Sequence, residues 1–273
     1  MTPIPRTLRT ILDRATDRVA RRLNSSADER SAQLRREIAE LRAEVVQQGN
    51  RVFDRVVEFE IRSRRDIVYA GDQRAGREGS DFAGRHFLGA RQFAGANETL
   101  RYSVQQAPTG GMALEFGVAT GATLRCIVEE RRSGEVFGFD CFDGLPEAWL
   151  SGLPAGSFTQ ERLPDVPGAE LVVGLFDDTL PDFLDQHPGP VDFVHVDSDL
   201  YSSAATVLGL VGPRLQVGSV VHFDEFYNYP GWQAHELRAW TEFVENSGME
   251  FDYLAHAYSD CQVSVRITAT GRA

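Results

Sequence analysis

The stretch LEFGVATG at residues 114–121 decides the fold. Its apolar residues are typical of a buried parallel strand, and its glycines form a turn into a helix that we expect to begin near Thr123. The stretch VFGFD at 136–140 follows, and its acid, Asp140, comes 19 residues after Gly121. This pattern predicts the first strand, turn and helix of a nucleotide-binding sheet, with Asp140 at the end of the next strand.

The spacing of the residues in this turn indicates the kind of nucleotide that it binds. Glu115, Gly117 and Gly121 do not form the G-x-G-x-x-G pattern, and the third glycine that suits a dinucleotide is missing. The pattern therefore favours an adenosine ligand without a diphosphate, S-adenosyl-L-methionine, with Asp140 accepting hydrogen bonds from both ribose hydroxyls. Such a turn also occurs in α/β folds that bind no nucleotide, and the motif alone leaves that alternative open.

Apolar runs and helical patterns alternate along the rest of the chain. Strands are predicted at 113–117, 136–140, 170–174, 191–196 and 218–223, and helices at 97–107, 122–132, 178–186, 202–214 and 233–247. This alternation predicts a parallel sheet with right-handed crossovers. The runs 251–258 and 261–268, joined by Ser259-Asp260, predict a hairpin, so that the last strand is antiparallel. The fold class is therefore α/β: a class I methyltransferase Rossmann-like fold with a seven-stranded, mostly parallel sheet and a C-terminal antiparallel β-hairpin.

An N-terminal helical segment at 1–65 precedes this methyltransferase domain, which we assign to 66–273. Helices are predicted at 6–24 and 27–48, separated by Asn24-Ser25-Ser26, and Leu34, Ile38, Leu41 and Val45 form a heptad-like seam in the second. We expect the seam to pack on the protein itself or on a second subunit, giving a homodimer or higher homo-oligomer. The alternative is an arginine-rich helix lying on an anionic membrane surface.

Two further segments are predicted to be irregular. Residues 66–95 are rich in glycine, arginine and aspartate and indicate a loop-bearing segment near the active site. Residues 145–168 hold four prolines and three glycines without a period, and long loops of this kind are usually lids or substrate loops.

Composition limits the partners. Residues 1–65 carry a net charge of +5 and residues 66–273 carry −17, so the acidic main domain argues against a nucleic-acid substrate. No apolar run is long enough to span a membrane, and the N-terminus lacks the apolar core of a signal peptide. Three cysteines without metal-like spacing indicate reduced thiols, and we expect a cytoplasmic protein. All 28 basic residues are arginine, which excludes a lysine base.

Acidic side chains follow two of the predicted strands. Asp197 and Asp199 come after the strand at 191–196, and Asp224 and Glu225 come after the next one. The carboxyl ends of parallel strands meet at one crevice, and neighbouring strands lie about 4.8 Å apart. Like charges at this distance repel unless a cation is present. Mg²⁺ prefers oxygen ligands, so Asp197, Asp224 and Glu225 are the candidate metal ligands, leaving positions for vicinal hydroxyls of a substrate.

Several alternatives remain open at this crevice. Asp199 precedes a helix and has the position of an N-cap. As a general base we favour Asp199, with Asp197 and His235 as alternatives. His195 and His222 lie within strands, where a histidine is more often a buried core residue than a base. Four aromatic side chains on the same rim suit either stacking on a sugar ring or packing of a lid: Tyr201, Tyr227, Tyr229 and Trp232.

The motifs resemble the macrocin O-methyltransferase-like family of class I methyltransferases, which act on sugars of antibiotics. The resemblance covers roughly residues 95–268 and rests on EFGVATG (115–121), GFDCFDGLPE (138–147), GLFDDTLP (174–181), HVDSDLYSS (195–203) and FDEFYNYPGWQAHE (223–236). It implies S-adenosylmethionine as donor, Mg²⁺ dependence and a saccharide hydroxyl as acceptor.

By matching motifs, the resemblance places Asp140 on the ribose, and Phe142 and the Phe176–Asp178 turn beside the donor. It also assigns the metal to Asp197, Asp224 and Glu225. The family usually has cysteine or glycine at the position of Ser198 and often a second aspartate at that of Glu225, and neither difference removes an oxygen ligand.

Two other functions are kept as alternatives. A catechol-type O-methyltransferase uses the same metal chemistry on an aromatic diol. A non-catalytic scaffold with a nucleotide fold would have no use for an acid cluster that costs stability. A dehydrogenase is disfavoured by the glycine spacing and by the C-terminal hairpin.

Overall fold

The computed structural model describes residues 6–131 and 134–271, and the chain divides into the units Met1–Ile67 and Val68–Ala273. The predicted helix end at 132 lies outside the described residues. No helix within the described ranges is both long and apolar enough to cross a bilayer.

The first unit consists of one helix, α1, which runs without a break from Arg6 to Arg65. The predicted break at Asn24-Ser25-Ser26 is wrong. Ser25 Oγ donates to the carbonyl oxygen of Arg22 at 3.1 Å, so its side chain bonds back to the helix rather than capping a new one. Neither asparagine nor serine has the steric conflict by which proline ends a helix, and their propensity cost is only fractions of about 1 kcal/mol each.

The second unit is built on one eight-stranded sheet with the order β1-β7-β8-β6-β5-β2-β3-β4. The strands are β1 (Arg91–Phe93), β2 (Met112–Phe116), β3 (Val136–Asp140), β4 (Glu170–Val173), β5 (Val191–Val196), β6 (Leu215–Phe223), β7 (Glu250–Ala257) and β8 (Val263–Ala269). Only β8 is antiparallel to its neighbours among these described strands. The predicted fold class is confirmed, and the order reverses between β2 and β5, where α/β sheets bind their ligands.

The strand β1 was not predicted. It has three residues and extends the sheet beyond the expected seven strands by pairing in parallel with β7. A strand this short carries no period that the sequence could reveal.

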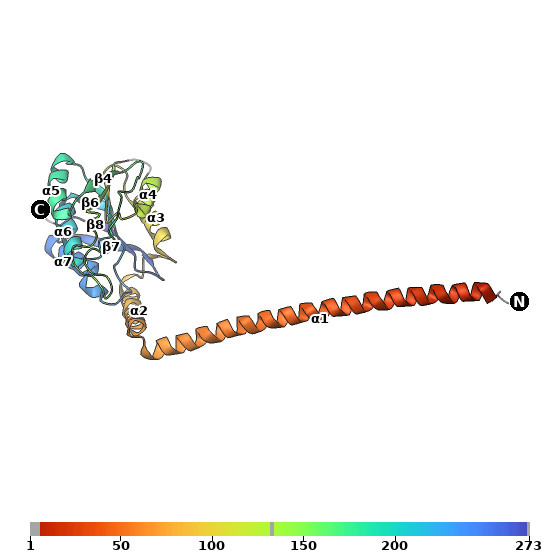
Figure 1. The fold of residues 1–273 in the computed structure, drawn as a ribbon. Coiled ribbons are helices and arrows are strands. Elements are labelled where there is room, and N and C mark those ends of the chain that lie inside the picture. The colour runs from red at the N-terminus through yellow and green to blue at the C-terminus, as the bar shows by residue number, and fades with distance from the viewer. Residues whose placement is uncertain (1–5, 132–133, 272–273) are drawn as a thin grey trace. The chain divides into compact units, whose positions relative to one another are not determined.

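Helices cover both faces of the sheet (Figure 1). One hydrophobic cluster contains side chains of α5 (Phe176–Gln186), α6 (Tyr201–Val211) and α7 (Glu236–Ser247), and the other those of α3 (Ala96–Gln106) and α4 (Ala122–Glu130). Two short 3-10 helices, η1 (Gly212–Arg214) and η2 (Trp232–Ala234), complete the unit. This arrangement buries the central strands on both sides and leaves their carboxyl ends for a site.

Helix α2 (Ile67–His86) lies where a loop was predicted, and that prediction is wrong. Two of its glycines, Gly71 and Gly79, are contact positions rather than turns. A Cβ on Gly71 would lie 3.3 Å from Pro230, and one on Gly79 would lie 3.4 Å from Asn228. Glycine therefore lets the helix pack closely on the segment after β6, and this gain compensates for the low helix propensity of glycine.

The segment between β3 and β4 contains neither helix nor strand, as predicted for 145–168. It is tied together by its own backbone: Leu145 N donates to Ser157 O at 2.9 Å, and Gly156 N donates to Leu145 O at 2.8 Å. Its side chains reach the carboxyl ends of the strands, where they form part of the cavity described below.

Candidate active site

A cavity of about 430 Å³ lies at the carboxyl ends of the parallel strands. Its lining follows strands β2 to β6 and includes Gly117 and Ala119, Asp140 and Cys141, Gly174 to Asp177, Asp197 to Asp199, and Glu225. The loop after β3 contributes Gly144, Leu145, Pro146, Trp149 and Phe158. The cavity therefore occupies the crevice in which open α/β sheets bind ligands.

The turn after β2 requires glycine at two positions. Gly117 has φ of 97°, and a Cβ there would lie 1.7 Å from the backbone oxygen of Asp197. Gly121 has φ of 74° and precedes α4, and a Cβ there would lie 2.7 Å from Val166. Gly117 lines the cavity, whereas Gly121 shapes the turn without being part of the lining. The missing Cβ of Gly117 brings β2 against the strand that carries the acids.

Asp140 holds this turn in place. Its Oδ2 accepts hydrogen bonds from the backbone N–H groups of Val118 and Ala119 at 2.9 and 2.8 Å, and its Oδ1 accepts one from Phe142 at 2.7 Å. An ionised carboxylate offers about four acceptor positions, so it can still accept from a ligand. Asp140 lines the cavity, and its predicted contact with a ribose remains a prediction.

Besides Gly121, three predicted cofactor residues are not part of the cavity lining: Glu115, Phe142 and Asp178. Glu115 is wholly buried, and Phe142 belongs to the hydrophobic cluster beneath α4. Asp178 lies in the first turn of α5, next to Phe176 and Asp177, which do line the cavity. The structure thus brings Phe176, but not these three, to the cavity.

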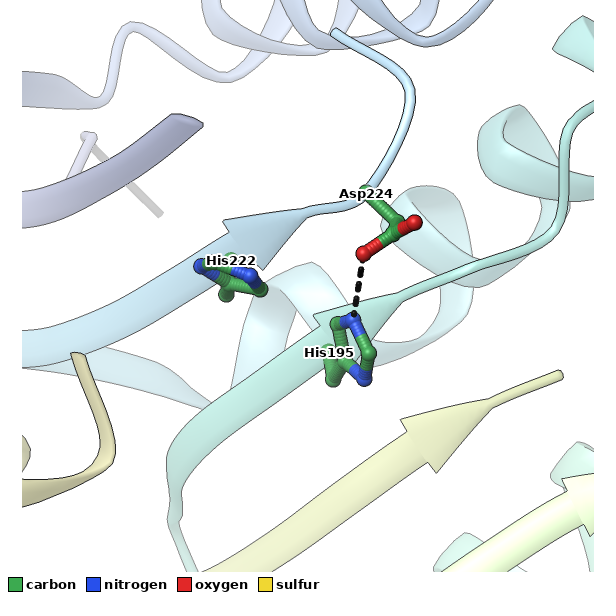
Figure 2. Close-up of side chains that lie close together, drawn as sticks. All are labelled: His195, His222 and Asp224. Carbon is green, nitrogen blue, oxygen red and sulfur yellow. Dashed lines mark ion pairs between the residues drawn. The ribbon is translucent and has the colours of Figure 1, made fainter. Parts of the chain in front are cut away.

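Glu115 instead contacts a histidine that the sequence indicated only as a core residue. Its Oε1 lies 2.8 Å from Nδ1 of His195, and both side chains are fully buried. Nε2 of His195 lies 3.7 Å from Oδ1 of Asp224. A dashed line marks this ion pair in Figure 2. Burial by itself would lower the pKa of the His195 imidazole, but the carboxylates of Asp224 and Glu115 outweigh this effect and raise that pKa well above its usual value. The raised pKa favours the imidazolium form of His195 between Glu115 and Asp224, while burial also raises the pKa of Glu115.

His222 lies beside His195 on the neighbouring strand and is also fully buried (Figure 2). Its Nδ1 lies 2.8 Å from Oγ of Ser264. Burial, together with the nearby charge of His195, lowers the pKa of His222 to about 3, so this imidazole is neutral. Ligand atoms of His195, His222 and Asp224 lie within 4.8 Å of one another.

The three predicted metal ligands come together. One carboxylate oxygen from each of Asp197, Asp224 and Glu225 lies within 4.8 Å of the others. Burial and the charge of Asp224 raise the pKa values of both Asp197 and Glu225 well above their usual range. Burial would also raise the pKa of Asp224, but His195 overrides it and lowers that pKa to about 2. The carboxylates of the cluster therefore repel one another, and a bound cation would relieve this repulsion.

A fourth buried acid, Glu236, supports this cluster and was missed in the sequence. It is the first residue of α7, and its Oε2 accepts a hydrogen bond from the backbone N–H of Glu225 at 3.0 Å. Burial and the charge of Asp224 raise its pKa well above the usual value. The pattern H-E at the start of a helix was the available signal, because a glutamate in a first turn commonly accepts backbone N–H bonds.

Asp199 lines the cavity and does not cap a helix. The N-cap of α6 is Leu200, and no side chain hydrogen-bonds to that helix end, so the capping alternative is wrong. Asp199 is 8% exposed and has φ of 59°, a conformation that usually costs about 1–3 kcal/mol outside glycine and is retained mainly at functional sites. Burial and the charge of Asp224 raise its pKa to about 7.

His235 and most of the aromatic rim lie outside the cavity. His235 precedes α7 instead of lying on it, and it does not line the cavity. Tyr227, Tyr229 and Trp232 are buried in the hydrophobic core. Trp149, from the loop after β3, is the aromatic side chain that lines the cavity beside Phe158 and Phe176, and the absence of any period in this loop hid it from sequence reasoning.

Residues 114–226 match a family profile described as a methyltransferase domain. The matched segment begins at β2, contains the glycine turn and ends just after the acids that follow β6. Together with the sheet order, this match shows that the chain is an S-adenosylmethionine-dependent methyltransferase.

Among solved structures, the chain is similar to the calicheamicin methyltransferase CalS11, with 22% identity, 62% of this chain and 76% of that chain covered, and a TM-score of 0.48. It is similar to the O-methyltransferase NovP with 22% identity, coverage of 63% and 79%, and a TM-score of 0.46. An O-methyltransferase from Bacillus cereus in complex with SAH shows 14% identity, coverage of 78% and 97%, and a TM-score of 0.41. No protein with a curated description matches the chain.

Proposed function

We propose that this chain is a Mg²⁺-dependent O-methyltransferase that methylates a hydroxyl of a sugar. The observation that carries the proposal is the convergence of Asp197, Asp224 and Glu225 at the cavity that also contains Gly117 and Asp140. A metal-capable cluster and a nucleotide-type turn therefore share one crevice. The sequence motifs shared with sugar O-methyltransferases support the choice of acceptor.

The residues present fit a hard divalent cation. The three candidate ligands all offer carboxylate oxygens, which Mg²⁺ prefers. Oε2 of Glu225 is buried and has no hydrogen-bond partner within the described residues. A buried carboxylate oxygen without a partner is costly, and a cation at the cluster would satisfy it. When bound, Mg²⁺ supplies a Lewis acid that lowers the pKa of a coordinated hydroxyl.

The chain's own residues have three tasks in this proposal. Gly117 and Asp140 hold the donor at one end of the cavity. Trp149 contacts the acceptor ring. Asp199 accepts the proton of the reacting hydroxyl, because it lines the cavity and is free of any helix end. Since the sulfonium donor is already activated, holding the two reactants in line can contribute about 7–11 kcal/mol.

An aromatic diol is the alternative acceptor, because vicinal phenolic oxygens would meet the same carboxylate cluster. The apolar and aromatic part of the lining, from Leu145 to Phe158, would suit such a ring as well. A panel of nucleotide sugars, glycosides and catechols with labelled S-adenosylmethionine separates the two. Turnover of catechols without turnover of any saccharide would replace the sugar proposal.

Metal dependence is tested on the same panel. Excess chelator should abolish turnover, added Mg²⁺ should restore it, and binding of S-adenosylhomocysteine should survive chelation because Gly117 and Asp140 are not in the metal cluster. Asp197→Asn and Asp224→Asn should each lower turnover far more than donor affinity. The matched control is Asp182→Asn, because Asp182 is an exposed acid on α5 that neither lines the cavity nor belongs to the cluster.

Full turnover in excess chelator, with no metal in elemental analysis, would leave these acids with a structural or acid–base role only. Binding of S-adenosylhomocysteine without turnover of any acceptor would instead favour the non-catalytic scaffold.

A further inference from the structure

Helix α1 exposes a row of large aliphatic side chains. Leu34, Ile38, Leu41, Val45, Val52 and Val56 are between 49% and 70% exposed, and we call this row the α1 stripe. Single exposed aliphatic residues are normal on protein surfaces, but a row along one helix marks a surface that binds something. The question is what covers it.

The spacing of the aliphatic residues is regular over most of the helix. Leucine or valine recurs every 11 residues at 12, 23, 34, 45 and 56. A second set has the same 11-residue spacing and begins seven residues after the first, at positions 19, 30, 41 and 52. These positions are Val19, Arg30, Leu41 and Val52, so only Arg30 interrupts the aliphatic set before residue 63. The 4-3-4 spacing of Leu34 to Val45 is the part of this repeat that also fits a heptad.

An 11-residue repeat spans three turns at 3.67 residues per turn, close to the 3.6 of a straight helix. The stripe therefore stays on one face along α1, which is about 90 Å long at 1.5 Å per residue. The five positions from 12 to 56 span four repeats, which meets the three or four that indicate a coiled coil. Helices much longer than 25 residues also commonly gain their stability from such packing.

The charges beside the stripe argue against a membrane as its partner. Residues 34–61 contain five arginines and six acidic residues. A helix that lies on an anionic bilayer needs a clear excess of basic residues on its polar face. Arginine and glutamate alternate around the stripe instead, as at Glu40, Arg42 and Glu44, and mixed flanking charges are typical of helices that pair with one another.

We propose that the α1 stripe binds the α1 stripe of a second copy of this chain, in a coiled coil with the right-handed supercoil that an 11-residue repeat favours. A repeat is complementary to itself, so an identical chain provides matching layers at every turn. The site makes the protein a self-associating enzyme through a segment that lies outside its methyltransferase unit.

The test uses the full chain and two double variants. Leu41→Asp with Val45→Asp places two acids on the stripe. Ala43→Asp with Gln47→Asp places the same two charges on the opposite face of the same turns, two residues away in each case. Both pairs introduce the same charges, and the control pair loses more helix propensity because it replaces alanine and glutamine, so a weaker helix alone cannot explain an effect seen only in the stripe variant.

Sedimentation equilibrium should give the full chain at least twice its 30.3 kDa monomer mass. The stripe variant should sediment at the monomer mass, and the control variant should keep the mass of the full chain. Each protein should bind S-adenosylhomocysteine with unchanged affinity, which shows that the methyltransferase unit has folded.

Three results would overturn the proposal. The first is a monomeric full chain, and the second is a stripe variant whose mass equals that of the control. The third is binding of the full chain to vesicles of phosphatidylserine and phosphatidylcholine, lost in the stripe variant while both remain monomeric, because that result would identify a membrane as the occupant.

Discussion

Replacing His195 by asparagine tests the buried charge network most directly. Asparagine keeps a donor near the position of Nδ1, which faces Glu115 at 2.8 Å, and removes Nε2, which faces Asp224 at 3.7 Å. The variant also removes the positive charge between the two carboxylates. Glu115 is completely buried, so water cannot replace the lost positive charge.

The expected loss is large. At an effective dielectric constant of about 20, opposite charges 3.7 Å apart attract by about 4 kcal/mol, and the bond to Glu115 becomes weaker because its donor is no longer charged. Desolvation offsets part of the attraction in the native protein, but removing one partner leaves the other charge buried without a counterion. Such changes cost about 3–5 kcal/mol, and we expect His195→Asn to lower the free energy of unfolding by that amount.

The pH dependence has a definite sign. The pKa of His195 is raised in the folded protein, so its contribution to stability is fully present below the unfolded value of about 6.5 and is lost as pH rises through the higher folded value. The difference between wild type and variant should therefore be largest at or below about pH 6.5 and should decrease above it.

Urea unfolding in the presence of chelator, followed by tryptophan fluorescence, measures the effect. His187→Asn is the matched control, because His187 packs on Phe183 and lies in neither carboxylate cluster. We expect that control to change the free energy of unfolding by less than about 1 kcal/mol. If His195→Asn changes it no more than the control does, His195 is not an imidazolium between carboxylates and the reasoning is refuted.

Three further predictions concern single sites. Gly117→Ala should destabilise the protein by more than about 3 kcal/mol, visible as lost soluble protein or a lowered melting temperature, because its Cβ would meet the backbone of Asp197; an unchanged melting temperature would contradict this. Asp140→Ala should weaken binding of S-adenosylhomocysteine by about 1.5–3 kcal/mol in calorimetry, and wild-type affinity would remove Asp140 from the site. Arg131→Met removes the ion pair of the buried Asp192 together with the hydrogen bonds that Arg131 donates to the carbonyl oxygens of Pro108 and Gly111, and it should cost about 3–5 kcal/mol in urea unfolding; a loss of less than about 1 kcal/mol would contradict this.

The sequence predicted the central sheet well because its strands carry strong local signals. The strand at 191–196 was predicted with the bounds that β5 has, since an apolar run ends there in acids. The N-terminal helices were predicted less well. Serine and asparagine in α1 and glycine in α2 look like breaks locally, but a back-bonded side chain and a close helix contact override the local preference.

The candidate site, like the fold, was predicted only in part from the sequence. The convergence of Asp197, Asp224 and Glu225 follows from strand ends alone, and the structure brings their oxygens within 4.8 Å. The inward direction of Glu115 could not be predicted in the same way. It depends on the register between β2 and β5, which places Glu115 opposite His195 and is set by packing across the whole sheet.

That register explains how donor turn and acid cluster are joined. Glu115, His195, His222 and Ser264 stand opposite one another in turn across β2, β5, β6 and β8. Hydrogen bonds join the first two and the last two of these side chains, so the row crosses the sheet through its core. Glu115 lies two residues before Gly117, and His195 reaches Asp224. If the glycine turn moves, the acid cluster either moves with it or the buried charge-assisted hydrogen bond between Glu115 and His195 breaks. Breaking that bond costs more than about 1.5 kcal/mol. The network thus couples the position of the glycine turn to that of the acid cluster.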